Sequence, residues 1–223
     1  MKPKFISLKK SFTLLERIRS FLFPLKLEKE MDAKTQIPFE ILLQNNQIVY
    51  NTPHANQSNK ELKYAFHQLF YKEKIYQKAY DKVLVLGLGL GSVIQLLQEK
   101  CTMQTIVGVE SNEAVLDILR KYYNIENVEM NCSDAGFYRD ESLYDLIIID
   151  VFEDDKIPKH LLNVVYISNI MKCLAPNGKL IWNILQHKMD TSILELFTRK
   201  VHVLSGNTFC IYEMPANSVS IHN

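Results

Sequence analysis

Three glycines at alternate positions follow an apolar run near the middle of this 223-residue chain. Residues 83–86 are all apolar, and Gly87, Gly89 and Gly91 come directly after them. An unbroken apolar run that ends at glycine is typical of a parallel strand buried on both faces. Glycine permits a tight turn there and lets a ligand approach the backbone. Residues 92–100 are predicted to form a helix, whose first N–H groups favour a negatively charged group.

Acidic side chains stand at the ends of three later strands of the expected sheet. Glu110 and Asp150 each end an apolar run, and Asp134 follows a third strand. Ligands of open parallel sheets bind beyond the carboxyl ends of the strands. Glu110, about 20 residues after the glycines, is placed to accept both hydroxyls of a ribose. Asp134 is placed to meet an adenine amine, and Asp150 faces the reacting group. Alternatively, each of these acids simply caps a helix.

Strands and helices alternate through the rest of the chain, which predicts an α/β, Rossmann-like fold with parallel pairing and right-handed crossovers. The last two strands are joined by a short turn that contains glycine, so they must be antiparallel. The strands are expected at 82–87, 105–110, 128–132, 144–150, 179–184, 201–204 and 208–212, and the helices at 92–100, 113–123, 160–174 and 190–200.

The first part of the chain is predicted to form a small appendage. Residues 1–58 contain an amphipathic helix at 8–22 and two short strands, 39–43 and 47–50, that form a hairpin. A polar, turn-rich stretch follows the hairpin and marks the boundary. The main domain is expected to cover residues 59–223.

This appendage is basic, because residues 1–30 hold eight Lys and Arg against three Glu. A basic amphipathic helix can lie on an anionic membrane. It can equally pack on its own domain or on a second subunit, and a homodimer through this region is one expectation. The sequence leaves these alternatives open.

Composition narrows the classes of partner and compartment. The formal net charge is +1, which gives no argument for a nucleic-acid partner. No apolar run reaches the ~20 residues that a membrane span needs. The four cysteines are scattered without a C-x-x-C pair, so they are expected to be reduced thiols of a cytoplasmic protein and not a metal site.

The G-x-G-x-G loop together with an antiparallel final strand pair resembles the class I S-adenosylmethionine-dependent transferases, and among them the spermidine synthase-like proteins. The segments that carry the resemblance are 83–92, 109–110, 134–135, 144–150 and 157–162, and Asn183 at the end of the fifth strand fits it too. The resemblance implies a class I methyltransferase fold: a mostly parallel seven-stranded sheet with an antiparallel last strand. It also implies S-adenosylmethionine, or its decarboxylated form, as cofactor.

The resemblance assigns roles to named residues. It implies that Gly87, Gly89 and Gly91 hold the methionine part of the cofactor, that Glu110 with the adjacent Ser111 binds the ribose, and that Asp134 with Ala135 contacts the adenine. Asp150 would lie near the transferred group.

The departures from the family pattern lie on the substrate side. Leu90 stands where aminopropyltransferases carry the aspartate that holds the aminopropyl amine. After the fourth strand, Asp150 is kept and Glu153 falls at the second acid of the family pattern. Upstream, only Gln57, Glu61 and Tyr64 remain of the polyamine side. The full cofactor is therefore expected to bind more tightly than the decarboxylated form.

Several functions fit this pattern. The first is methyl transfer to a small-molecule acceptor. The second is aminopropyl transfer from decarboxylated S-adenosylmethionine, with Asp150 and Glu153 as the catalytic pair that binds and deprotonates an amine. A third is a non-catalytic cofactor-binding or assembly module. An NAD-binding protein is disfavoured, because the third glycine comes one place too early for the dinucleotide fingerprint.

Overall fold

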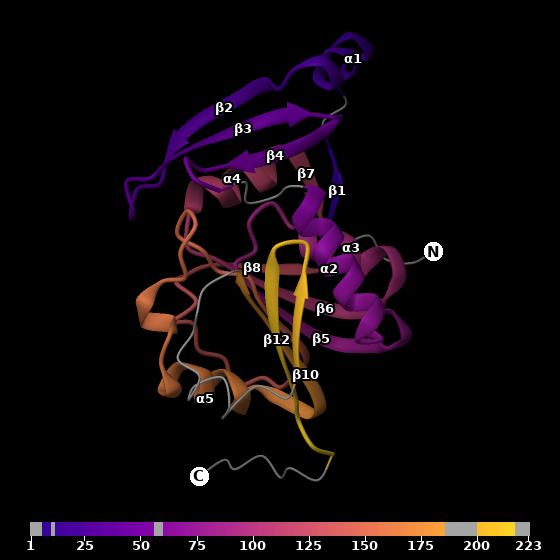
Figure 1. The fold of residues 1–223 in the computed structure, drawn as a ribbon, viewed down its shortest axis with the longest axis vertical. Coiled ribbons are helices and arrows are strands. Elements are labelled where there is room, and N and C mark those ends of the chain that lie inside the picture. Colours follow the sequence, from indigo (N-terminus) through magenta and orange to yellow (C-terminus); the bar gives the residue numbers. More distant parts are fainter. Residues whose placement is uncertain (1–5, 10–11, 56–59, 186–199, 217–223) are drawn as a thin grey trace.

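The computed structural model describes residues 6–9, 12–55, 60–185 and 200–216. Its main body is one seven-stranded sheet with the strand order β11-β12-β10-β9-β5-β6-β8 (Figure 1). Strands β10, β9, β5, β6 and β8 are parallel to one another, and β12 is antiparallel to both β10 and β11. This confirms the expected mostly parallel sheet. The strands are β5 (Ala79–Leu86), β6 (Thr102–Glu110), β8 (Val128–Cys132), β9 (Tyr144–Ile149), β10 (Leu174–Leu185), β11 (Lys200–Leu204) and β12 (Asn207–Glu213).

Helices pack on both faces of this sheet. Alternate residues of β5 point to opposite faces, and each set belongs to a separate apolar cluster. Val83 and Val85 pack with residues of α2 (Lys60–Lys72), α3 (Ser92–Lys100) and α4 (Glu113–Tyr122). Leu84 and Leu86 pack with residues of α5 (Val164–Lys172). Both faces of the strand are buried, as its continuous apolar run predicts. Among the described helices, none has the length and apolar character needed to cross a bilayer.

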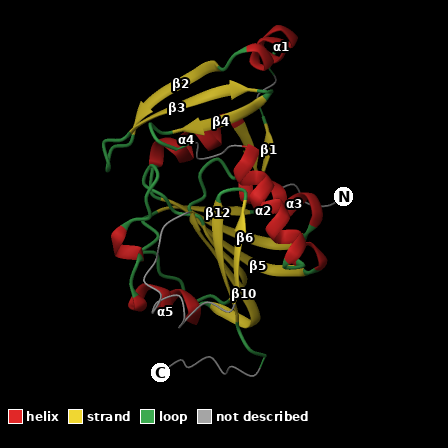
Figure 2. Ribbon diagram, in the orientation of Figure 1, coloured by secondary structure: helices red, strands yellow, loops and turns green. Residues whose placement is uncertain are grey.

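A separate three-stranded antiparallel sheet forms the appendage (Figure 2). Its strands are β2 (Leu25–Met31), β3 (Pro38–Gln44) and β4 (Gln47–Asn51). Asn45 and Asn46 form the turn between β3 and β4, with φ values of 49° and 60°. Asparagine tolerates this left-handed backbone, so the expected hairpin is confirmed. Strand β2 is an addition that the sequence pattern did not predict.

The first helix is shorter than the sequence pattern predicts. The expected helix at 8–22 begins only at Leu14, and α1 covers Leu14–Leu22. Thr13 and Glu16 form a reciprocal capping box, which satisfies free N–H groups and sets this start. Upstream of it, β1 (Ile6–Leu8) pairs with β7 (Tyr123–Ile125) beside the main domain.

Other boundaries also differ from the prediction, and β5 and β6 begin earlier than expected, at Ala79 and Thr102. The expected helix at 160–174 is a short 3-10 turn, η2 (Lys159–Leu161), followed by α5, which begins after the Asn163 cap. The strand expected at 179–184 is longer, because β10 covers Leu174–Leu185, and its register with β9 shifts between Leu174 and Lys179. A second 3-10 turn is η1 (Ile75–Gln77).

Two predictions fall outside the described residues. One is the helix expected at 190–200, of which only Lys200 is described, as the first residue of β11. The other is residue Gln57.

Candidate functional site

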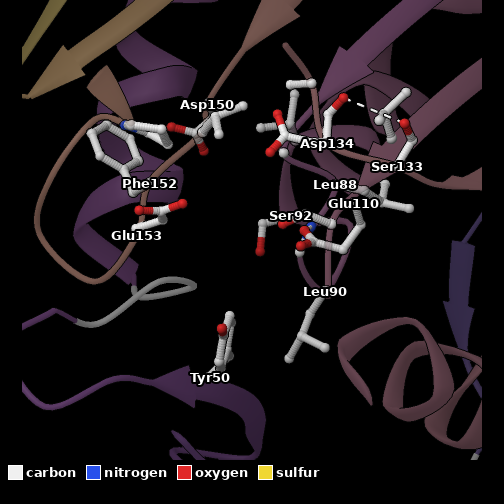
Figure 3. Close-up of a pocket in the computed structure, with 18 of the residues that line it drawn as sticks. Tyr50, Leu88, Leu90, Ser92, Glu110, Ser133, Asp134, Asp150, Phe152 and Glu153 are labelled. Atoms are coloured by element: carbon white, nitrogen blue, oxygen red, sulfur yellow. Dashed lines mark hydrogen bonds between the residues drawn. The ribbon is translucent and has the colours of Figure 1, made fainter. Parts of the chain in front are cut away.

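A pocket lies at the carboxyl ends of β5, β6 and β9, where the sequence placed the ligand (Figure 3). The glycine loop and Glu110 form one wall, and the segment after β9 forms the opposite wall. The predicted site residues that line it are Gly87, Gly89, Glu110, Ser111, Asp134, Ala135, Asp150 and Glu153. Gly91 is not among the lining residues, because it lies under Ile6.

The glycine loop has the backbone that its sequence requires. Gly87 and Gly89 have φ values of 84° and 50°, in the left-handed region. A Cβ at Gly87 would lie 2.2 Å from the Asp150 carbonyl oxygen, so a larger residue would separate β5 from β9. A Cβ at Gly89 would meet nothing within 4 Å. Gly89 therefore borders open space, where a ligand can approach the backbone.

The Glu110 carboxylate binds the glycine loop. It accepts hydrogen bonds from the backbone N–H groups of Gly89, at 2.9 Å, and Asn112, at 3.1 Å. Desolvation by the surrounding atoms raises its pKa, and these backbone hydrogen bonds partly oppose the shift. The side chain is half-buried and reaches the pocket (Figure 3). It is thus placed both to brace the loop and to accept a hydroxyl of a ligand.

Asp150 lies on the opposite wall, against a neutral partner. The amide Nδ2 of Asn183 donates to its Oδ1 at 2.9 Å and also to Oδ1 of Asn207 at 3.1 Å. Desolvation raises the pKa of Asp150 to about 6, and the hydrogen bond from Asn183 only partly opposes that rise. A carboxylate with a pKa in this range can accept a proton near neutral pH. The sequence pattern singled out Asp150 but did not give Asn183 a role beside it.

Asp134 has partners that the sequence did not reveal. It forms an ion pair with Lys34 of the β2–β3 connection, and His160 Nε2 lies 2.8 Å from its Oδ1. Burial alone would raise its pKa, but the hydrogen bonds from Lys34, His160 and the Gly136 N–H outweigh this and lower the pKa. Its carboxylate is therefore engaged with a cation, whereas the sequence pattern predicts a contact with an adenine amine. Both Asp134 and the buried Ala135 still line the pocket.

The segment after β9 turns back sharply over the pocket. Glu153 and Lys156 form an isolated antiparallel bridge, and Asp154 between them has a φ of 58°. Phe152 is half-buried and packs against the apolar cluster that includes α5, while its ring also lines the pocket. Glu153 is exposed at the mouth (Figure 3). Phe152 therefore contributes both to the core and to the pocket wall.

A second pocket adjoins the first and shares Asp150, Phe152 and Leu62 with it. Its lining is acidic, because Glu61, Asp154 and Asp155 join Asp150 there. Asp154 is tied to the appendage side of the chain, where it accepts from the backbone N–H of His54 at 3.0 Å and pairs with the His54 ring. Four acidic residues thus line a cavity next to the first pocket.

The appendage also contributes to the site. Tyr50 of β4 is half-buried and lines the first pocket from below (Figure 3). Leu90, which is 2% exposed, lines the same pocket beside the glycine loop. No sequence signal identified Tyr50, because the hairpin pattern does not say which domain its side chains face. Within the described ranges, no group of three or more His, Cys, Asp and Glu side chains is placed to hold a metal ion.

Comparison with known sequences gives partial matches. No family model matches the chain. The polyamine aminopropyltransferase of Vibrio vulnificus is 28% identical over 111 residues, which are 46% of this chain and 37% of that protein. The polyamine aminopropyltransferase of Clostridium beijerinckii is 31% identical over 108 residues, 44% of this chain and 38% of that protein. A malonyl-[acyl-carrier protein] O-methyltransferase of Bacillus cereus is 32% identical over 77 residues, 34% of this chain and 29% of that protein. The matches span less than half the length of these curated relatives.

Solved structures agree over more of the chain. The spermidine synthase from Thermotoga maritima superposes with a TM-score of 0.64 and 14% identity, covering 88% of this chain and 75% of that one. The N-methyltransferase NodS from Bradyrhizobium japonicum superposes with a TM-score of 0.52 and 14% identity. The match covers 71% of this chain and 99% of that one. These likenesses and the sheet order confirm the class I methyltransferase fold and the resemblance to the spermidine synthase-like proteins.

Proposed function

We propose that this protein is a transferase that moves a group from an S-adenosyl sulfonium donor to an amine. The observation that carries the proposal is the place of Asp150, whose side chain lines both the glycine-loop pocket and the adjoining acidic pocket. A group that is held in the first pocket would thus face an acceptor that is held in the second.

The first pocket suits the donor. The open space at Gly89 admits a ligand against the backbone, and Glu110 with the adjacent Ser111 would take the ribose hydroxyls. Asp134 and Ala135 would border the adenine, and Gly87 and Gly91 would shape the loop. Asp134 would then exchange its ion pair with Lys34 for the adenine amine, or serve both at once.

The acidic pocket suits a cationic acceptor. Glu61, Asp154 and Asp155 would attract the distal ammonium groups of a small amine. The reacting nitrogen attacks the carbon beside the donor sulfur, the carbon–sulfur bond breaks, and its electron pair stays on sulfur. The proton that the nitrogen loses passes to Asp150, whose pKa of about 6 suits this step near neutral pH. Glu153 at the pocket mouth would assist in holding the amine.

The relatives support aminopropyl transfer as the reaction, because three of the five curated matches are called polyamine aminopropyltransferases and a fourth a probable one. Methyl transfer is the second candidate, and Leu90 is the observation that favours it. The ammonium of a decarboxylated donor would lie against this leucine without a carboxylate, which is costly. The carboxylate of the full donor would instead meet the first N–H groups of α3.

The test begins with calorimetry of the purified chain against S-adenosylmethionine, its decarboxylated form and S-adenosylhomocysteine. Each donor is then incubated with putrescine, and mass spectrometry identifies an aminopropyl or a methyl adduct. Asp150→Asn should bind donor but form no adduct. The proposal fails if no donor binds, or if Asp150→Asn transfers as fast as the parent chain.

A further inference from the structure

Helix α1 presents its apolar stripe to solvent. Leu14, Leu15, Ile18, Phe21 and Leu22 recur at helical spacing on one face, and they are between 53% and 75% exposed. Figure 1 shows α1 at the upper end of the molecule, beyond the three-stranded sheet. An amphipathic helix of a globular domain normally turns this stripe to its own core. Here the stripe faces away from it, so of the alternatives that the sequence left open, packing of these side chains on their own domain is excluded.

The opposite, polar face holds the helix in place. Ser20 is 1% exposed, and its Oγ accepts the Asn46 N–H at 3.0 Å. The Ser20 carbonyl accepts the Asn45 N–H at 2.9 Å, and Arg17 Nε donates to Asn46 Oδ1 at 2.8 Å. The β3–β4 turn thus fixes the helix by hydrogen bonds, with the apolar stripe outward.

Charge identifies the surface that this stripe fits. At 3.6 residues per turn, Arg17 and Arg19 fall on the two borders of the stripe, and both are exposed. The acid of the helix, Glu16, accepts hydrogen bonds from Thr13 in the N-terminal cap and does not lie on either border of the stripe. If a second copy packed its stripe against this one, the borders of the two stripes would meet, and arginine would face arginine. An apolar stripe with cationic borders is instead the pattern of a helix that lies in a membrane interface.

We propose that α1 docks the protein on an anionic lipid surface. The stripe inserts among the upper acyl chains, and Arg17 and Arg19 contact the headgroups. This surface is independent of the pocket, so the proposal does not depend on the reaction that is catalysed there.

The test is flotation of the full chain with vesicles of equal parts phosphatidylglycerol and phosphatidylcholine, and with vesicles of phosphatidylcholine alone. We expect binding to the anionic vesicles that weakens with added salt. Ile18→Ser with Phe21→Ser should lower the partition coefficient at least about tenfold, because two apolar side chains no longer insert. Arg19→Gln should lower it about fivefold, since a cationic side chain near an anionic surface contributes about 1 kcal/mol.

The matched control is Tyr71→Ser, which removes a 75% exposed apolar side chain from α2. It should bind vesicles like the parent chain, and all variants should melt at the parent temperature. The proposal is overturned if the parent chain floats with neither vesicle, or if the stripe variant and the control float equally. It is also overturned if sedimentation shows a dimer that the stripe variant abolishes while vesicle binding is absent, because a second copy then covers the stripe.

Discussion

Asn183 places a neutral amide, not a cation, against the Asp150 carboxylate, at 2.9 Å. Asn183 is fully buried and shares the same amide nitrogen with Asn207. A lysine or arginine in this position would hold the pKa of the carboxyl low, whereas an amide compensates for only part of the desolvation. Asp150 therefore keeps a pKa of about 6 and can change its protonation state in the physiological range.

The first prediction is a pH dependence of turnover. Only the ionised Asp150 can accept the proton of the amine, so kcat/KM should rise as the pH passes about 6 from below. Asn183→Ala removes the hydrogen bond that lowers this pKa, so the same rise should move to higher pH. The measurement is kcat/KM against pH for both chains. The control is Asn124→Ala, at an exposed residue of β7, and its kcat/KM should rise at the same pH as that of the parent chain. A flat parent profile would exclude Asp150 as the proton acceptor.

The second prediction concerns donor binding at Glu110. Glu110→Gln keeps the shape of the side chain but removes its charge. Hydrogen bonds to a charged group contribute roughly 1.5–3 kcal/mol, so the Kd of the donor should rise at least about tenfold. Calorimetry measures this value, with Glu113→Gln on the exposed start of α4 as the matched control. An unchanged Kd in a folded Glu110→Gln protein would remove Glu110 from the ribose role.

The third prediction is a change of donor preference at Leu90. If methyl transfer, the second candidate, is the reaction, the parent chain should bind full S-adenosylmethionine more tightly than the decarboxylated form. Leu90→Asp places a carboxylate beside the glycine loop, and one ion pair in this cleft should shift the ratio of the two Kd values by about tenfold or more towards the decarboxylated donor. Leu90→Asn is the uncharged control and should shift the ratio little. Exclusive binding of the decarboxylated donor by the parent chain would contradict the prediction.

A buried charge cluster lies at the end of α2, away from both pockets. Glu73, which is 6% exposed, accepts hydrogen bonds from Lys179 at 2.8 Å and Lys200 at 3.3 Å, and His202 Nε2 lies 2.8 Å from its Oε1. Burial alone would raise the pKa of Glu73, but these partners outweigh it and hold the pKa at about 2. The cluster joins α2 to β10 and β11.

The fourth prediction is that this cluster stabilises the fold in a pH-dependent way. Glu73→Gln leaves the buried Lys179 without its counter-ion, so the free energy of unfolding at pH 7 should fall by about 3 kcal/mol. The pKa of Glu73 is lower in the folded state than its ordinary value of 4.5. The stabilisation by the ionised carboxylate is therefore complete above pH 4.5, and it is lost as the pH falls towards 2. Urea unfolding of both chains at pH 7 and pH 3 measures this.

The difference between the two chains should therefore shrink at the lower pH. The control is Glu99→Gln, which changes an exposed acid at the end of α3. Its free energy of unfolding should match that of the parent chain at both pH values. A constant difference between Glu73→Gln and the parent at pH 7 and pH 3 would contradict the assigned pKa. Donor binding should not change, because the cluster does not line the pocket.

Local patterns were enough to predict the centre of the fold. The apolar run before Gly87 and the helix from Ser92 follow from short-range rules, and the structure has α3 over the predicted residues. Glu110 and Asp150 could be placed in one pocket because parallel strands bring their carboxyl ends to the same edge. These positions depend on strand direction, which the alternation of elements already determines.

Features that depend on distant parts of the chain could not be predicted in this way. The ion pair between Lys34 and Asp134 joins residues 100 positions apart, and neither belongs to a periodic pattern. The outward stripe of α1 has the same amphipathic spacing that an inward stripe would have. Only the hydrogen bonds of Ser20 to the β3–β4 turn determine which face is buried. Periodicity identifies an apolar face, but it does not identify what that face meets.

The pairing of β1 with β7 has a consequence for biosynthesis. Ile6 covers Gly91, exchanges backbone hydrogen bonds with the Gln98 side chain and lies opposite Ile125 in the ladder. Because translation proceeds from the amino end, Ile6 leaves the ribosome before the other half of its ladder has been translated. Closing so long a loop must await β7 and costs chain entropy. Residues 6–8 can therefore dock only after β7 has been translated, and Gly91 stays uncovered on that side until then.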